Sequence, residues 1–340
     1  MFGNRTSRRE NASMLLDFQT HREGTRSEHP TSAQVHFGNP ISRIRHLIGT
    51  LVSIAADHGS SISSAELVLL LPQGAFASST ELESFVACDP SLREELLVRD
   101  GQVTLKGSES LARERIQQVE LSEERAQAAQ AFSDRLVRTC PWIRIVAISG
   151  STAYAGSRRR DDVDFYLVTR RKRLWITLLF ALTSARFHRL RSSDSPQLCF
   201  NRILEENECL DAFRSDRDPL FAREALSLRI LQGRDYYREL LSSAAWMEEV
   251  FPVLFRQAIK TTTIPSRAES DDERRGWLIV NAIAFAALAP YLMVVGLWRN
   301  HRLLRAGRLD ARFRTVMRPG FFAYESRKYD LLRDKYSKVF

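Results

Sequence analysis

The stretch that decides the fold runs from Ile143 to Val168 and reads IRIVAISGSTAYAGSRRRDDVDFYLV. It begins with a β-rich apolar run, which predicts a buried strand, and it ends with a second strand over 163–168. Between the strands the chain breaks at a Gly-Ser turn, then forms a short helix and a polar, basic segment. Side chains alternate between the faces of a strand, so Asp162 and Asp164 point the same way. We therefore expect two carboxylates to lie side by side near a glycine turn.

Paired carboxylates beside such a turn suit a divalent cation that carries the phosphates of a nucleotide. Mg²⁺ prefers one or two carboxylates together with phosphate oxygens, and small turn residues let backbone N–H groups approach those phosphates. Asp162 and Asp164 are thus the candidate catalytic residues and metal ligands, and Gly150 and Ser151 are candidate nucleotide-binding residues. In the alternative interpretation, Gly-Ser is an ordinary turn and Asp-x-Asp solvates a strand edge, which leaves the combination of the two motifs unexplained.

At these residues the chain resembles the nucleotidyltransferase superfamily, which has the DNA polymerase β-like fold. The family signature is a strand, a Gly-Ser turn, a short helix and Asp-x-Asp on the next strand, and this chain has Gly150-Ser151 and Asp162-Val163-Asp164 in that order. Phrases over 198–201 and 218–224 resemble a little-characterised prokaryotic branch of the superfamily. The resemblance implies an α/β fold, a nucleotidyltransferase-like mixed sheet with flanking helices. It also implies Mg²⁺-dependent transfer of a nucleoside monophosphate from a nucleoside triphosphate to an acceptor, which can be a protein, an RNA or a small molecule.

The arginines that follow the glycine turn have two interpretations. Arg158, Arg159 and Arg160 either neutralise the leaving pyrophosphate or form a solvated loop. We take Arg158 and Arg160 as further candidate nucleotide-binding residues.

The strand expected over 197–204 departs from the family pattern, because the third metal-binding carboxylate usually lies there. Asn201 stands within this strand, and alternation places it on one face with Cys199 and Glu205. Asn201 is therefore a candidate third metal ligand, with Glu205 as the alternative. A missing third carboxylate also removes the obvious base for an acceptor hydroxyl. A second hypothesis follows: a catalytically impaired protein of this fold that acts as a nucleotide- or protein-binding scaffold.

The chain divides into four predicted parts: a flexible tail (1–40), a winged-helix-like module (41–115), the nucleotidyltransferase core (116–215) and a helical C-terminal region (216–340). The module is predicted from three helices, over 41–59, 64–71 and 79–88, and a hairpin over 96–105 whose Asp-Gly turn supplies positive φ angles. Its second and third helices carry Glu66, Glu81 and Glu83 and no basic cluster, which favours packing or specificity over DNA binding.

Composition bounds the compartment and the partners. The chain has 340 residues with a hydrophobic share of 44% and a formal net charge of +9. The positive charge is compatible with nucleotides, RNA or anionic lipid, but it is spread along the chain. The four cysteines form no C-x-x-C pair, which is typical of reduced thiols in a cytoplasmic protein.

Residues 277–298 form a second informative segment, with no charged residue and tryptophan at both ends. Its length allows a membrane span, but Pro290 and Asn281 interrupt the pattern. Arginines beyond 298 would also hold the far end in the cytoplasm, on the same side as the upstream core. We favour two helices broken near Pro290 and buried against the domain. A membrane-embedded hairpin and a single span are the alternatives, so membrane association stays open.

Overall fold

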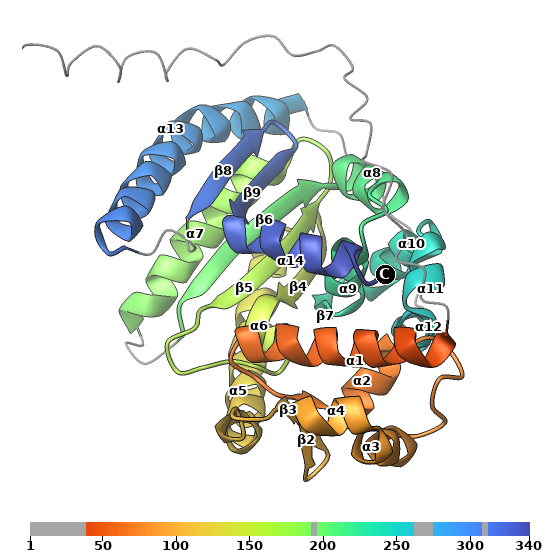
Figure 1. Ribbon diagram of the computed structural model, residues 1–340. Coiled ribbons are helices and arrows are strands. Elements are labelled where there is room, and N and C mark those ends of the chain that lie inside the picture. The colour runs from red at the N-terminus through yellow and green to blue at the C-terminus, as the bar shows by residue number, and fades with distance from the viewer. Residues whose placement is uncertain (1–38, 192–195, 262–274, 308–311) are drawn as a thin grey trace, which may run out of the picture. The chain divides into compact units, whose positions relative to one another are not determined.

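The computed structural model describes residues 39–191, 196–261, 275–307 and 312–340, which form a mixed α/β protein (Figure 1). These residues contain fourteen helices, a six-stranded mixed sheet and a small three-stranded antiparallel sheet, so the predicted α/β class is confirmed. The predicted tail over 1–40 lies outside the described residues except for Asn39 and Pro40. Asn39 caps the first helix, because its side chain accepts a hydrogen bond from the backbone of Ile41.

The first part of the chain builds the small sheet and its helices. Its elements are α1 (Pro40–Asp57), β1 (Ile62–Ser63), α2 (Ser64–Leu70), α3 (Ser79–Cys88), α4 (Pro90–Glu95), β2 (Leu96–Arg99) and β3 (Gln102–Leu105), with strand order β1-β3-β2. The hairpin turn has positive φ angles at Asp100 and Gly101, as predicted. The sequence analysis did not predict β1 or α4. The signal for α4 is Asp89 followed by Pro90, a capping residue and a proline at the first helical position.

The remaining elements build the six-stranded sheet and its cover. They are α5 (Ser110–Thr139), β4 (Ile143–Ser149), α6 (Gly150–Ala153), β5 (Val163–Thr169), α7 (Leu174–Arg191), β6 (Leu198–Glu205), α8 (Glu206–Ser215), α9 (Pro219–Leu226), β7 (Arg229–Gln232), α10 (Arg234–Ser242), α11 (Trp246–Val250), α12 (Pro252–Lys260), α13 (Arg275–Arg305), β8 (Phe313–Arg318), β9 (Phe321–Ser326) and α14 (Arg327–Ser337). The strand order is β7-β4-β5-β6-β9-β8, in which β5 and β6 are parallel and the other neighbours antiparallel.

Three strands of this sheet come from the region predicted to be helical. β7, β8 and β9 all lie beyond residue 215, so the region predicted to be mostly helical also supplies three strands, and the sheet crosses the predicted boundary. β7 has only four residues between two helices, too few for a periodic signal. The turn at Pro319-Gly320 joins β8 and β9, which the sequence analysis did not predict as a hairpin.

The sheet has a hydrophobic core on each face. On one face, Phe132 of α5, Phe165 of β5 and Trp175 of α7 are fully buried, and α13 adds Ala284, Leu288 and Leu292. On the other face, alternate residues of β4 and β5 pack with α8 to α12, α14 and the N-terminal helices. Because other elements cover both faces of the sheet, the sequences of β4 and β5 are nearly continuous apolar runs.

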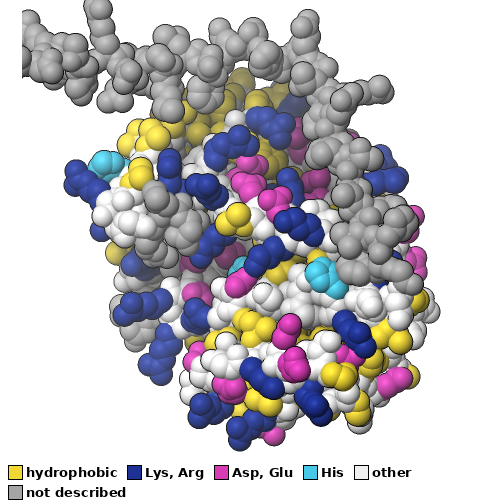
Figure 2. Space-filling model, viewed as in Figure 1, with side chains coloured by type: hydrophobic (Ala, Val, Ile, Leu, Met, Phe, Trp, Pro, Cys, Tyr) yellow, Lys and Arg dark blue, Asp and Glu magenta, His cyan; other side chains and the backbone are white. Residues whose placement is uncertain are grey.

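The hydrophobic segment over 277–298 lies within one continuous helix, α13, so the prediction of two helices broken at Pro290 is wrong. Pro290 and Ala286, whose carbonyl loses its helical partner, are both exposed, so the freed carbonyl is not enclosed by the described residues. Asn281 is explained by its contacts: its Oδ1 accepts hydrogen bonds from the backbone N–H groups of Trp175 and Ile176 at the start of α7. Figure 2 shows hydrophobic side chains at the upper left, where Figure 1 places α13.

Candidate functional site

The glycine turn lies directly against the second aspartate. Gly150 is the first residue of α6 and has φ +63°, a conformation that favours glycine. A Cβ atom on Gly150 would lie 2.5 Å from Asp164 Oδ2. The strands create this approach, because Ser149 at the end of β4 pairs with Asp164 in β5. The two predicted motifs are therefore in contact.

The two aspartates and one cysteine form a cluster of ligand atoms. A carboxylate oxygen of Asp162, a carboxylate oxygen of Asp164 and the Cys199 sulfur all lie within 4.8 Å of one another. The parallel pairing of β5 and β6 places Cys199 opposite Asp164. Two carboxylates fit Mg²⁺, whereas a thiol suits softer metals, so Asp162 and Asp164 are the residues that would hold Mg²⁺. The sequence analysis did not include Cys199 among the ligands. We call these three residues the acidic cluster.

The negative charge of the acidic cluster is not fully balanced by the groups around it. Burial, with the charges of Asp162 and Asp161, raises the pKa of Asp164 to about 7, although a hydrogen bond from Asn201 opposes the rise. Burial and the two aspartates also raise the pKa of the Cys199 thiol far above its usual value. A proton or a bound cation relieves this repulsion. The cluster thus has the electrostatics of a cation site.

Asn201 joins the cluster, and Glu205 does not. Asn201 donates a hydrogen bond to Asp164 Oδ1 and accepts one from the Cys199 thiol at 3.0 Å. The expectation that Glu205 shares their face is wrong, because the pairing of β5 with β6 skips Asn201 and reverses the alternation after it. The Glu205 carboxylate instead accepts hydrogen bonds from the backbone N–H groups of residues 172–174, before and at the start of α7.

Within the described residues neither Arg158 nor Arg160 forms a hydrogen bond or ion pair with the acidic cluster, although Arg158 lines one cavity together with Gly150 and Ser151. The Arg158 guanidinium donates to the carbonyls of His58 at 3.3 Å and Gly59 at 2.6 Å, and Arg160 is exposed. A buried arginine that the sequence did not reveal interacts electrostatically with Asp161 and Asp162. Arg125 of α5 is 5% exposed, and its Nη1 has no hydrogen-bond partner among the residues that the structure describes.

Burial lowers the pKa of Arg125, and the charges of Asp161 and Asp162 on its guanidinium partly offset this effect. Its charge therefore partly balances the acidic loop. Arg125 lies on a long helix with no motif around it, so the sequence gave no signal for this role.

A cavity of about 330 Å³ opens beside the glycine turn. Gly150, Ser151 and Asp161 line its polar edge, and Leu51 and Ile54 of α1 belong to its apolar wall. A volume of this size falls in the range of small-molecule sites. The cavity thus connects the turn with the N-terminal helices.

Two charged residues of α9 also line this cavity. Arg223 lies over the ring of Tyr154, with the guanidinium carbon 4.8 Å from the ring centroid. Burial raises the pKa of Glu224, whose carboxylate accepts a hydrogen bond from Tyr329. The charge of Glu224 also contributes to the raised pKa of Asp164. The sequence analysis noted the phrase over 218–224 only as part of the resemblance and assigned no role to either residue.

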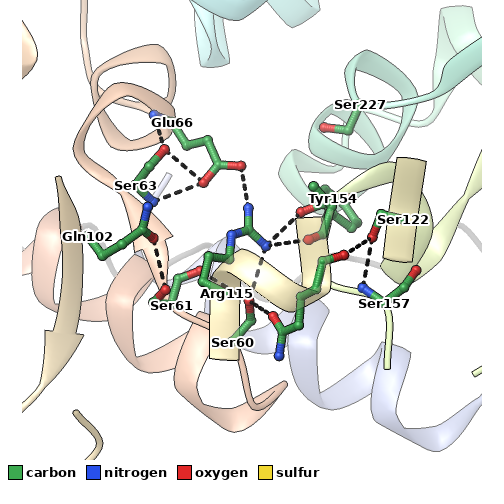
Figure 3. A network of polar contacts seen from close by, with 12 residues as sticks. Ser60, Ser61, Ser63, Glu66, Gln102, Arg115, Ser122, Tyr154, Ser157 and Ser227 are labelled. Carbon is green, nitrogen blue, oxygen red and sulfur yellow. Dashed lines mark hydrogen bonds and ion pairs between the residues drawn. The ribbon is translucent and has the colours of Figure 1, made fainter. Parts of the chain in front are cut away.

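A second polar network holds the other end of the same turn (Figure 3). Arg115 of α5 is 6% exposed and forms an ion pair with Glu66 of α2 at 2.7 Å. Its Nη1 donates to the hydroxyl of Ser60 and to the carbonyls of Tyr154 and Ala155, at 3.0 to 3.1 Å. We call this set the Arg115 network. It fixes the segment after α6 against the N-terminal helices.

Comparison with known proteins adds no assignment. No family model matches the chain, and no curated protein or solved structure is found to be similar to it.

Proposed function

We propose that this protein is a Mg²⁺-dependent nucleotidyltransferase that moves a nucleoside monophosphate from a nucleoside triphosphate to an acceptor. The observation that carries the proposal is the contact between Asp164 and Gly150, in a cluster where Asp162 and Cys199 offer two further ligand atoms. Strained or crowded arrangements of this kind cost stability and cluster at functional sites.

The reaction is an in-line displacement at the α-phosphorus. An acceptor oxygen or nitrogen forms a bond to the α-phosphorus, the bond from this phosphorus to the bridging oxygen breaks, and pyrophosphate leaves with the bond's electron pair. Asp162 and Asp164 would hold Mg²⁺, which would supply charge stabilisation at the phosphates. Backbone N–H groups at Gly150-Ser151 and the Ser151 hydroxyl bind the terminal phosphates.

The cavity supplies the remaining groups of the proposed mechanism. Glu224 is the carboxylate that takes the acceptor proton, because its pKa is raised and it lines the cavity beside the turn. Arg223 neutralises charge on the phosphates in place of Arg158, whose guanidinium is committed to backbone carbonyls. The acceptor can be a protein, an RNA or a small molecule.

The arrangement of the elements supports the finer fold assignment within this proposal. Strand β4, helix α6 and strand β5 follow one another in the order of the nucleotidyltransferase signature. Within residues 41–115 the elements follow in the order α1, β1, α2, α3, α4 and the hairpin of β2 and β3. This order supports a winged-helix-like module in which α4 is added before the hairpin. We place the protein in the cytoplasm, where nucleoside triphosphates and reduced thiols are available.

One observation favours a second candidate function, a nucleotide- or protein-binding scaffold without turnover. An amide, Asn201, occupies the position beside Asp164 where a third carboxylate would hold the metal more strongly. The two functions share the same site and differ only in pyrophosphate release.

The test incubates the full chain with each of the four labelled nucleoside triphosphates and Mg²⁺ and measures pyrophosphate release and label transfer. We expect turnover with wild type and its loss in Asp164→Ala. The matched control is Asp211→Ala, which changes an exposed aspartate of α8 and leaves turnover intact. Nucleotide binding by calorimetry without pyrophosphate release selects the scaffold. Undiminished turnover in Asp164→Ala contradicts the proposed site.

A further inference from the structure

One side of α13 is apolar and is not covered by other residues that the structure describes. The side chains of Ile279, Ile283, Val294 and Leu297 are 63% to 65% exposed, and Trp298 is 57% exposed. Ile279 and Ile283 are one turn apart, Val294 and Leu297 are one turn apart, and about three turns separate the two pairs, so they form a stripe along the helix. Contiguous apolar surface of this kind marks an interaction site.

The opposite side of α13 is bound to the protein. Asn281 binds the backbone at the start of α7, and Asn300 exchanges two hydrogen bonds with the backbone of Phe313 in β8. Between them Gly296 approaches closely, because a Cβ atom there would lie 2.6 Å from Thr315 Oγ1. Within the described residues α13 is the one helix long and apolar enough to cross a membrane, but a spanning helix would have to leave these contacts. The contacts therefore favour a helix that lies along a surface.

Helix α7 extends the same surface. It packs beside α13 (Figure 1) and exposes Leu179, Phe187 and Leu190, the last two by 66% and 71%. Arginines accompany the apolar residues on both helices: Arg186 and Arg189 near the end of α7, and Arg299, Arg302 and Arg305 at the end of α13. Neither helix contains an aspartate or a glutamate. We call the exposed residues of these two helices the α7–α13 surface.

We propose that the α7–α13 surface binds an anionic lipid bilayer, with both helices lying at the interface and the arginines among the headgroups. Exposed apolar side chains can enter the apolar part of a membrane interface, while nearby arginine and tryptophan side chains reach the headgroup region. Each basic side chain near the surface adds attraction to anionic lipid. A second copy of the chain fits less well, because neither helix offers a carboxylate that could pair with the arginines of its copy. This inference is independent of the proposed catalytic function.

The test measures sedimentation of the full chain with two kinds of vesicle, phosphatidylcholine alone and phosphatidylcholine with phosphatidylglycerol. We expect binding to the anionic vesicles and weaker binding to the neutral ones. The double variant Ile283→Ser with Leu297→Ser lowers the partition coefficient at least about tenfold, because two exposed apolar side chains no longer enter the interface. Arg302→Gln with Arg305→Gln lowers binding to anionic vesicles about tenfold and leaves binding to neutral vesicles unchanged.

The matched control is Ile116→Ser with Leu331→Ser, which removes an isoleucine and a leucine that are 68% and 55% exposed on α5 and α14. This control binds vesicles as wild type does, and all variants keep the wild-type unfolding temperature. Equal binding of the Ile283→Ser, Leu297→Ser variant and wild type overturns the proposal. A dimer in the absence of lipid that this variant dissociates assigns the surface to a second copy and overturns it too.

Discussion

The two ends of the turn that follows β4 differ in how their polar groups are satisfied. At one end the Arg115 network surrounds a buried guanidinium with a carboxylate, a hydroxyl and two backbone carbonyls. At the other end Asp164 is buried against a glycine backbone beside Asp162 and Asp161, so burial and the charges of these acids raise its pKa to about 7. The same short segment thus carries a balanced polar network and an unbalanced one.

This difference separates architecture from binding. A buried charge whose hydrogen bonds are all made rigidifies a fold, and removing one partner leaves the others unsatisfied. A buried charge that is repelled by its neighbours lowers stability, and a ligand that neutralises it restores this stability. Variants at the two ends should therefore change opposite properties: stability at the Arg115 network, ligand binding at the acidic cluster.

The largest effect is expected from Arg115→Met. This change removes the donor that Arg115 gives to Glu66 Oε1 and to the carbonyls of Tyr154 and Ala155, so the free energy of unfolding falls by about 2–4 kcal/mol. Denaturation with urea measures the loss. The control is Arg113→Met, because Arg113 is exposed on the same helix and its removal changes stability by about 0.5 kcal/mol or less. A loss below about 1 kcal/mol for Arg115→Met would show that the network is not structural.

Gly150→Ala tests the contact that carries the proposed site. The new methyl group meets the Asp164 carboxylate at a positive φ, so we expect a loss of about 1–3 kcal/mol in stability and at least tenfold weaker Mn²⁺ binding. Calorimetry with Mn²⁺ as the probe measures the affinity. Gly49→Ala is the matched control: Gly49 lies within α1 with nothing within 4 Å of its added Cβ, and alanine there stabilises by about 0.5–1 kcal/mol.

Asp164→Asn tests the charge imbalance through pH. The pKa of Asp164 is about 7 in the folded protein and near 4 in the unfolded chain, so between these values the folded state holds one more proton. Stability therefore falls as pH rises through this window, by at most about 1.4 kcal/mol per pH unit from this group. Asn removes that part of the slope, and Mg²⁺ reduces it in wild type. Identical pH profiles for the two proteins would contradict the raised pKa.

The sequence predicted the two aspartates of the acidic cluster where local pattern decides the geometry. Gly150-Ser151 directly follows β4 and Asp162-x-Asp164 lies at the start of β5, so strand alternation and one short connection suffice to place them. The prediction for Glu205 was wrong for a local reason as well. The pairing of β6 with β5 skips Asn201, so the residues after it point to the opposite faces from those expected, and nothing in the sequence of β6 marks that irregularity.

Residues brought in by distant elements were beyond prediction. Arg125 comes from α5 and Glu224 from α9, and neither has a motif that ties it to the aspartates. The continuity of α13 was missed for another reason, because the cost of Pro290 depends on whether the freed carbonyl meets water or protein. The strands β8 and β9 were missed because pairing with β6 joins segments more than a hundred residues apart.

The smallest effect, and the finest distinction within the acidic cluster, is expected from Cys199→Ser. If the thiol is only a neighbour of the metal ligands, serine changes Mg²⁺ affinity by less than about threefold, because Mg²⁺ takes oxygen ligands. Cd²⁺ prefers thiolates, so its affinity should fall by about tenfold or more. Calorimetric titration of both ions into wild type and the variant separates the two roles of Cys199. Because burial and the two aspartates disfavour the thiolate, Cd²⁺ binding to wild type must also release a proton, which measurements in buffers of different ionisation enthalpy detect. Unchanged Cd²⁺ affinity in the variant would leave Asp162 and Asp164 as the metal ligands and remove Cys199 from the cluster.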